Sequence, residues 1–318
     1  MIRYVAFRLA ATVPMLLGIS LVLFTLLRLI PGDPAVAILM AMVDPGADIS
    51  HLELDRAALR EQLGLNEPYP VQYWTWLNNI LHGNLGISLR SRSPITSQLA
   101  QRLPATLQLS GAALGVMVTV ALPTGILGAV YHGRTVDRVA RFVALLGVSM
   151  PSFFLALLLM YGFSVQLGWF PTFGRGTPAH LVLPALTLGI GIAAGMSRLL
   201  RTSLLDVFSQ PYIVTAEAKG VPRHVIVFKH ALRNALLPVV TSFGLLIGGL
   251  LGGAVIVETI FSWPGIGRYI VDAIAGRDYP VIQAFALSMA LVYVAANFIV
   301  DILYRFIDPR VRVEGSHG

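Results

Sequence analysis

Residues 215–240, which read TAEAKGVPRHVIVFKHALRNALLPVV, bring together several side chains that could do chemistry. This stretch holds both lysines of the 318-residue chain, together with two arginines, two histidines and a single acid. Neither lysine follows a glycine, so a Walker A loop for nucleotide phosphates is excluded. The chain also has no His-Glu-x-x-His motif and no cysteine, and we expect no metal site. The charge of this stretch therefore favours contact with lipid or with another protein.

The composition is that of a membrane protein. Hydrophobic residues make up 56% of the chain and charged residues only 12%, whereas about 25% of the residues of a soluble domain are charged. The net charge of +7 could indicate a nucleic-acid partner, but the arginines lie in short tracts between apolar runs. Membrane topology explains these tracts better, because cations that flank the spans set the orientation of a membrane protein.

Six uncharged runs are long enough to cross a bilayer, which needs about 20 apolar residues of helix. They cover residues 9–27, 104–131, 142–167, 181–197, 235–257 and 279–300. The sequence therefore predicts an all-α integral membrane protein with six transmembrane helices. We expect four regions, namely an N-terminus with the first span (1–30), a helical segment outside the membrane (31–103), a five-span core (104–305) and a tail (306–318).

Cations near the ends of short loops indicate which side of the membrane is cytoplasmic. Alternate connections on one side carry Arg3, Arg8, Arg134, Arg138, Arg141, six cations between residues 198 and 233, Arg305, Arg310 and Arg312. The short loops of the other side carry only Arg175, Arg268 and Arg277. We therefore expect both termini and the loop at 202–234 to be cytoplasmic, and the segment at 31–103 to be extracytoplasmic.

Two short helices are predicted in the extracytoplasmic segment. Ser50 and Glu53 have the spacing of a capping box before an amphipathic run that ends at Gly64. Pro70 stands where a first helical residue belongs, and Gly83 stands where that second helix would stop. These helices could seat an external partner, cap the mouth of a pore, or pack on the rim of the protein itself.

The charged stretch has the pattern of a helix, a sharp turn and a second helix. Pro211 suits the first turn of a short helix, Gly220 suits its left-handed C-terminal cap, and Pro222 then begins the next helix. In that second helix Val225, Phe228 and Leu232 fall on one face, with the cations on the other. Ile226 and Val227 interrupt the polar face with apolar surface.

Two interpretations of this helix pair are open on physical grounds. A basic amphipathic helix at the membrane surface commonly binds lipid head groups. The glycine turn instead projects a compact knob, and apolar residues on the polar face favour contact with another protein.

Five segments resemble the permease subunits of bacterial ABC importers, in the branch that carries dipeptides and oligopeptides. The loop YIVTAEAKGVPRHVIVFKHALRNALLPVV resembles their cytoplasmic EAA loop, although Val214, Thr215 and Ala216 stand where the general motif has Glu-Ala-Ala. The other four, in chain order, are RLIPGDPA, LGWFPTFG, VETIFSWPGIGRYIVDAIAGRDYPVIQA and DPRVR. Together they are spread from residue 28 to residue 312, in the order typical of this family.

The resemblance implies a type I importer permease with an extracytoplasmic helical insertion after the first span. It implies that a knob sits in a cleft of a separate ATPase subunit; the residues that would form it are Ala216, Lys219, Gly220, Val221, Pro222, Arg223 and His224. The expected partners are a second, homologous permease in a heterodimer, two ATPase subunits, an extracytoplasmic binding protein and lipid of the bacterial inner membrane. ATP and Mg²⁺ would be bound by the ATPase, so this chain needs no cofactor of its own.

The implied cargo is a di- or oligopeptide, with nickel or glutathione as alternatives carried by the same architecture. Glu258 and Asn297 are polar groups near spans that could line the pathway, but hydrogen bonding between helices explains them equally well. Arg28, Glu258 and Asp301 lie at span ends, where we expect snorkelling or interfacial hydration to suffice. An ion-coupled transporter would need ionisable groups in mid-span, and a membrane enzyme would need a nucleophile and a base together in the spans; neither pattern is found.

Overall fold

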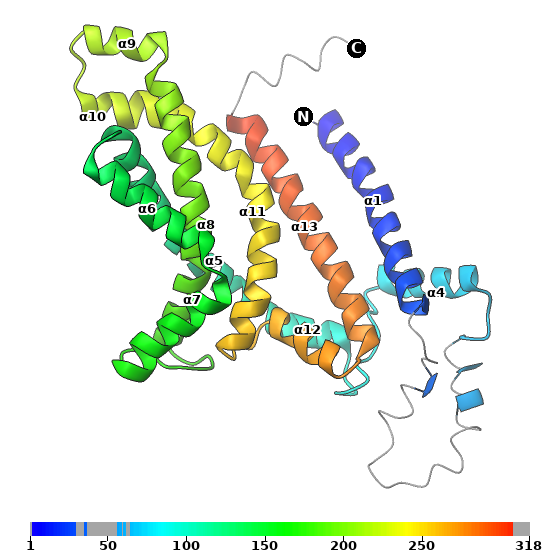
Figure 1. The fold of residues 1–318 in the computed structure, drawn as a ribbon. Helices are drawn as coiled ribbons and strands as arrows, with labels where there is room; N and C mark the ends of the chain where they lie inside the picture. Colours follow the sequence, from blue (N-terminus) through cyan, green and yellow to red (C-terminus); the bar gives the residue numbers. More distant parts are fainter. Residues whose placement is uncertain (1, 30–34, 37–55, 59, 62–63, 308–318) are drawn as a thin grey trace. The chain divides into compact units, whose positions relative to one another are not determined.

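The computed structural model describes residues 2–29, 35–36, 56–58, 60–61 and 64–307, and over these residues it is almost entirely helical (Figure 1). The elements are α1 (Ile2–Leu29), α4 (Tyr69–Leu81), α5 (Ile95–Val130), α6 (Thr135–Ser149), α7 (Ser152–Leu159), η1 (Met160–Gln166), α8 (Pro178–Phe208), α9 (Pro211–Ala218), α10 (Arg223–Val225), η2 (Ile226–Ala231), α11 (Leu232–Ile260), α12 (Ile266–Ala275) and α13 (Tyr279–Ile307). The two η elements are π-helices. The predicted all-α fold class is therefore confirmed.

Each predicted span falls within helical segments. Among the described residues, three helices are long and apolar enough to cross a membrane by themselves, namely α5, α8 and residues Tyr279–Phe298 of α13. A bent pair, Thr135–Ser149 with Ser152–Gln166, adds a fourth candidate, and shorter apolar helices cover Thr12–Leu26 and Gly248–Ile260. The protein is thus a multi-helix membrane protein, and the count of six spans remains a prediction.

The third predicted span, residues 142–167, is bent rather than one continuous helix, and its crossing of the membrane as a single span remains a prediction. α6 ends at Ser149, and the chain turns by 105° before α7 begins at Ser152. Met150 is extended, with ψ 120°, because the ring of Pro151 disfavours the helical conformation in the residue before it. Pro151 also lacks the N–H that would continue the helix.

The chain forms two compact units. The first comprises the described parts of Met1–Leu103 together with Tyr269–Val294, and the second comprises Pro104–Arg268 with the described residues that follow Val294. In the first unit, α1 packs against α4 through an aromatic cluster of Phe24, Tyr73 and Trp76. The hydroxyls of Ser20 and Tyr73 are 2.8 Å apart and join the same two helices.

The segment before and within α4 follows the predicted stop signals. Gly64 has φ 63°, with hydrogen bonds from Gly64 N to Glu61 O and from Leu65 N to Arg60 O, which is the Schellman pattern of a helix end. α4 begins at Tyr69, one residue before the predicted Pro70, and Gly83 follows its C-cap with φ 78°. The predicted capping box at Ser50 and Glu53 lies outside the described residues.

In the second unit, α8 packs against α6, α7 and α11 (Figure 1). Small residues allow the close approach: a Cβ added to Gly189 of α8 would lie 2.6 Å from Val116 of α5, and one added to Gly147 of α6 would lie 2.9 Å from Ala194. Such contacts are typical of helix packing in membranes, where small side chains let backbones meet. α8 is therefore the helix against which α5, α6, α7 and α11 pack.

Candidate coupling loop and the polar sites of the permease

The loop between α8 and α11 folds as α9, a glycine turn and α10, which continues through η2 into α11 (Figure 1). Gly220 N donates to Glu217 O at 2.9 Å, and Val221 N donates to Ala216 O at 3.1 Å. These two bonds and a φ of 75° at Gly220 form a complete Schellman motif, as the glycine spacing predicts. Pro222 then serves as the N-cap of α10 with ψ 139°. The predicted helix, turn and helix are confirmed as structure.

The seven residues predicted to form the knob lie together at this turn. Lys219, Gly220, Pro222, Arg223 and His224 are exposed, whereas Ala216 and Val221 are partly buried and pack against the core of the second unit. The turn therefore presents two cations and a histidine to the outside on a backbone that is fixed from within. Their role toward a partner remains a prediction.

The predicted faces of the second helix are wrong. Ile226 and Val227 are each only 3% exposed and pack within the chain, whereas Phe228, which the α-helical period places on the apolar face, is 62% exposed. The cause is η2, because a π-helix bonds residue i to i+5 and shifts the faces relative to an α-helix. The apolar surface that favoured protein contact is thus Phe228 rather than Ile226 and Val227.

Three contacts fix the loop to the helices. Ile213 of α9 is fully buried in the core cluster of the second unit. Asn234 Nδ2 donates to the Tyr212 hydroxyl at 2.7 Å, which joins α11 to α9. Arg223 Nη2 donates to the carbonyl oxygen of Val130 at 2.8 Å, and Val130 is the last residue of α5, whose carbonyl lacks an intrahelical partner. The loop is therefore attached to α5, α8 and α11.

A buried carboxylate at the start of α6 was not predicted from the sequence. Asp137 is fully buried, and Arg201 of α8 donates to both of its oxygens, from Nε at 2.7 Å and from Nη2 at 2.9 Å. Gly133 N donates to the same carboxylate at 3.0 Å, and Arg141 lies 3.4 Å from it. Arg201 Nη2 also lies 3.0 Å from His132 Nδ1, which must accept because a guanidinium only donates.

Glu258, a candidate pathway residue, is fully buried near the end of α11. The Thr106 hydroxyl donates to Oε1 at 2.6 Å, and Arg268 N donates to Oε2 at 3.0 Å. Arg268 stands in the first turn of α12, where free N–H groups favour a carboxylate. Thr106 in turn accepts from Ile266 N at 3.0 Å. The expectation of interfacial hydration is therefore wrong for Glu258, and the alternative of hydrogen bonding between helices describes its contacts.

Asn297, the other candidate pathway residue, lies on α13 and is partly buried. Neither placement tests a role in substrate passage, which remains a prediction for both residues.

The first unit contains a third polar site at the turn before α13. Asp278 is 2% exposed and accepts from the Ser88 hydroxyl at 2.6 Å and from Leu89 N at 3.2 Å. Nearby, the guanidinium of Arg102 lies 4.6 Å from the ring centre of Tyr269 in α12. Burial raises the pKa of the Tyr269 phenol above its ordinary value of 10, and the charge of Asp278 also raises it.

The apolar helical architecture defines the class of protein as an all-α, multi-helix membrane protein. The sequence-family model for the inner membrane component of binding-protein-dependent transport systems matches residues 121–313. The family model for the N-terminal part of such membrane components matches residues 1–110. The chain belongs to this family, as an inner-membrane permease of an ABC importer of the dipeptide, oligopeptide and nickel type.

Its relatives include the glutathione transport system permease protein GsiC. The Escherichia coli K12 protein is 43% identical over 312 residues, covering 98% of this chain and 99% of the relative. The Salmonella typhi protein is 44% identical over the same coverage. Membership of this family confirms that the chain is a transport component of a membrane rather than an enzyme.

The fold is similar to that of a solved ABC transporter. Structures of the MetNI methionine ABC transporter in inward-facing conformations match 66% of this chain and 96% of the other, with a TM-score of 0.57 at 20% identity. A second crystal form gives a TM-score of 0.58 at 19% identity. At this level of identity the likeness concerns the fold alone.

Proposed function

We propose that this chain forms part of the translocation channel for short peptides, with glutathione as the first substrate to test. The observation that carries the proposal is 43% identity to glutathione permeases over 98% of the chain. Glutathione is a tripeptide derivative, so it belongs to the same chemical class as the di- and oligopeptides implied by the sequence motifs. An extracytoplasmic binding protein would deliver the peptide to the channel.

We further propose that the turn between α9 and α10 is the contact for an ATPase subunit. This proposal is supported by the exposure of Lys219, Arg223 and His224 at the turn. The neighbouring Ala216 and Val221 pack against the core of the second unit. A rigid turn that displays side chains loses little conformational entropy when it binds. Phe228, which is 62% exposed in η2, adds apolar surface next to the same turn.

Movement of the ATPase would reach the channel through the contacts of the loop. α9 follows α8 directly, η2 continues into α11, and Arg223 binds the end of α5. A displaced knob would therefore move three helices of the second unit together. ATP can change the balance between inward-open and outward-open states only if the ATPase binds this loop better in one of them.

The remaining features of the complex follow from the same proposal. A second permease would complete the channel, two ATPase subunits would hold ATP and Mg²⁺, and the loop would face the cytoplasm. With six spans, a loop between the fourth and fifth lies on the same side as both termini. The termini are therefore proposed to be cytoplasmic too.

The test is uptake by the reconstituted importer, with this chain, its partner permease, the ATPases and the binding protein in vesicles. We expect labelled glutathione to enter when ATP is supplied to the side of the ATPases, and unlabelled short peptides to compete. Competition by nickel alone would instead indicate the metal-carrying branch. Uptake that persists without ATP and collapses with an ion gradient would reject the ATP-driven proposal altogether.

A further inference from the structure

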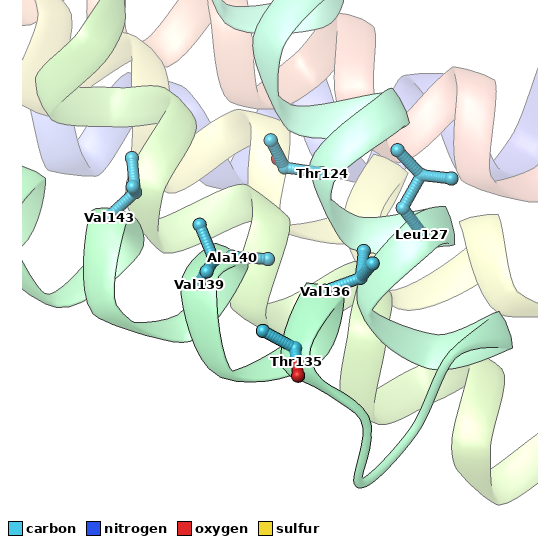
Figure 2. Close-up of a pocket in the computed structure, with 7 residues that line it drawn as sticks. All are labelled: Thr124, Leu127, Thr135, Val136, Val139, Ala140 and Val143. Carbon is cyan, nitrogen blue, oxygen red and sulfur yellow. The ribbon is translucent and has the colours of Figure 1, made fainter.

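A groove lies between α5 and α6 on the second unit, beside the short turn that joins them (Figure 2). Its volume is about 350 Å³, within the range of roughly 300–1,000 Å³ that small-molecule sites occupy. The lining residues are Thr124 and Leu127 from α5, and Thr135, Val136, Val139, Ala140 and Val143 from α6.

The wall of this groove is apolar even where threonines contribute to it. The Thr124 hydroxyl donates to Val120 O at 2.6 Å and lies 2.8 Å from the Ser197 hydroxyl of α8, so it is bound among the helices. The Thr135 hydroxyl accepts from Arg138 Nη2 at 3.3 Å. The groove is therefore suited to a hydrocarbon chain, which gains from leaving water or from close packing with such a wall.

One end of the groove carries positive charge. Arg138 is exposed, and its guanidinium is bound to Thr135 at the rim. Arg134 is also exposed, and its guanidinium carbon lies 5.9 Å from the ring centre of Tyr131. Tyr131 follows Leu127, a lining residue of the groove, by four positions. Asp137 does not neutralise this end, because it is buried and bound by Arg201. A tyrosine with arginines next to an apolar face is typical of the membrane–water interface.

We propose that this groove binds an anionic phospholipid, with one acyl chain along α5 and α6 and the phosphate at Arg134 and Arg138. The ligand must be amphiphilic, because an apolar groove continues directly into a cationic rim. It must be anionic, because two exposed arginines stand at the end of the groove and, among the described residues, neither forms an ion pair with an acid. Basic pockets between membrane helices bind anionic head groups. A protein side chain could fill the apolar part but would not in itself use the cationic rim.

The proposal is tested with the complete purified importer, placed in nanodiscs of phosphatidylcholine alone or of phosphatidylcholine with phosphatidylglycerol. Lipid that stays bound is identified by native mass spectrometry after release from the discs. Arg134→Gln and Arg138→Gln weaken the head-group site, and Val139→Trp fills the groove from a position that is 56% exposed and so tolerates the larger side chain. Arg198→Gln is the matched control, since Arg198 is an exposed arginine of α8 that does not line the groove.

The wild-type complex should retain phosphatidylglycerol in preference to phosphatidylcholine. Each arginine substitution should weaken retention about fivefold, the effect of one cation near an anionic surface. Val139→Trp should abolish retention, Arg198→Gln should leave it unchanged, and all variants should keep ATP-driven uptake measurable in phosphatidylcholine. Equal retention of the two lipids, or retention unaffected by the arginine changes, would overturn the proposal.

A second permease subunit is the competing occupant of the groove. Because the chain has no cysteine, Val139→Cys provides a single thiol for cross-linking. Efficient cross-linking of this thiol to the partner permease would overturn the lipid proposal. Labelling of the thiol by a lipid-soluble maleimide, without cross-linking to protein, is the result expected from a lipid-filled groove.

Discussion

The guanidinium of Arg201 in α8 donates two hydrogen bonds to the carboxylate of Asp137 in α6, from Nε to Oδ1 at 2.7 Å and from Nη2 to Oδ2 at 2.9 Å. The carboxylate is fully buried and the arginine side chain is only 16% exposed. Such a two-point pair is stronger and more directional than a single contact, because the planar guanidinium matches the carboxylate. It fixes the start of α6 to α8 close to the end of α5, where Arg223 of the loop is bound.

Arg201→Gln should destabilise the protein, because it leaves a buried carboxylate without its main partner. The expected loss is about 3 kcal/mol, the lower end for breaking a buried ion pair, since Arg141 and Gly133 N still contact Asp137. The measurement is thermal unfolding of the purified complex in mild detergent.

The double variant Arg201→Gln with Asp137→Asn should recover much of this loss, because it also removes the buried charge. The control is Arg138→Gln, because Arg138 is an exposed arginine on α6, the helix that carries Asp137. This change should alter stability little. A double variant no more stable than Arg201→Gln alone would contradict the ion-pair explanation.

Gly220→Val should uncouple ATP hydrolysis from uptake while the chain still inserts into the membrane. Gly220 has φ 75°, and a left-handed conformation costs a residue with a side chain about 1–2 kcal/mol, with β-branched residues worst. The turn would therefore relax and move Lys219 and Arg223. Uptake and ATPase activity are measured on the same vesicles.

Gly195→Val is the matched control, since a Cβ at Gly195 meets nothing within 4 Å and its φ is not in the left-handed region. It should keep coupled uptake. Normal ATP-driven uptake by Gly220→Val would reject the assignment of this turn to the ATPase contact.

Thr106→Val should weaken the attachment of the first residues of α12, Ile266–Arg268, to α11. The hydroxyl donates to Glu258 at 2.6 Å and accepts from Ile266 N at 3.0 Å, so its loss leaves two buried polar groups without this partner. The cost should be about 1–3 kcal/mol, again read from thermal unfolding. Thr106→Ser keeps the hydroxyl and should be close to wild type.

The control for this change is Thr119→Val, also on α5. Thr119 is exposed, and its hydroxyl bonds only carbonyls of its own helix, Gly115 O and Val116 O. It should therefore cost much less than Thr106→Val, and an equal cost at the two positions would contradict a special role for Thr106.

Tyr269→Phe should remove a loss of stability that the wild-type protein shows at alkaline pH. The folded pKa of Tyr269 lies above 10, so the folded protein holds this proton more tightly than the unfolded chain. The phenol's contribution is then fully present below pH 10 and is lost as the pH rises through the folded pKa. Unfolding temperatures of wild type and Tyr269→Phe, followed from neutral to alkaline pH, should differ by a constant amount below pH 10, and above it the wild type should lose stability relative to the variant. A difference independent of pH would contradict the raised pKa.

Local signals in the sequence predicted the coupling loop well. Pro211 and Pro222 mark the beginnings of the two helices, and Gly220 marks the end of the first, because each residue type has a backbone preference that acts within a few positions. The apolar runs likewise predicted helices, since an uncharged stretch of this length has few other structures available in a bilayer.

Contacts between distant residues were beyond such signals. Asp137 and Arg201 are 64 positions apart, and nothing in either neighbourhood indicates that they meet. The burial of Ile226 was missed because the faces were assigned with the α-helical period, whereas η2 follows the period of a π-helix. The bend at Pro151 has a local signal in the sequence, namely a proline inside an apolar run. This signal does not by itself predict a bend, because Pro123 and Pro184 also lie in apolar runs and occur within continuous helices.

The π-helix η2 makes one part of the coupling loop tolerant of a change in length. A π turn accommodates one residue more than an α turn, so a deletion of one residue within Ile226–Ala231 converts it to ordinary α-helix without separating α10 from α11. A deletion at the Gly220 turn cannot be accommodated in this way, because it removes a position that the Schellman motif requires. A one-residue deletion should therefore disturb the fold of this loop less within η2 than at the Gly220 turn.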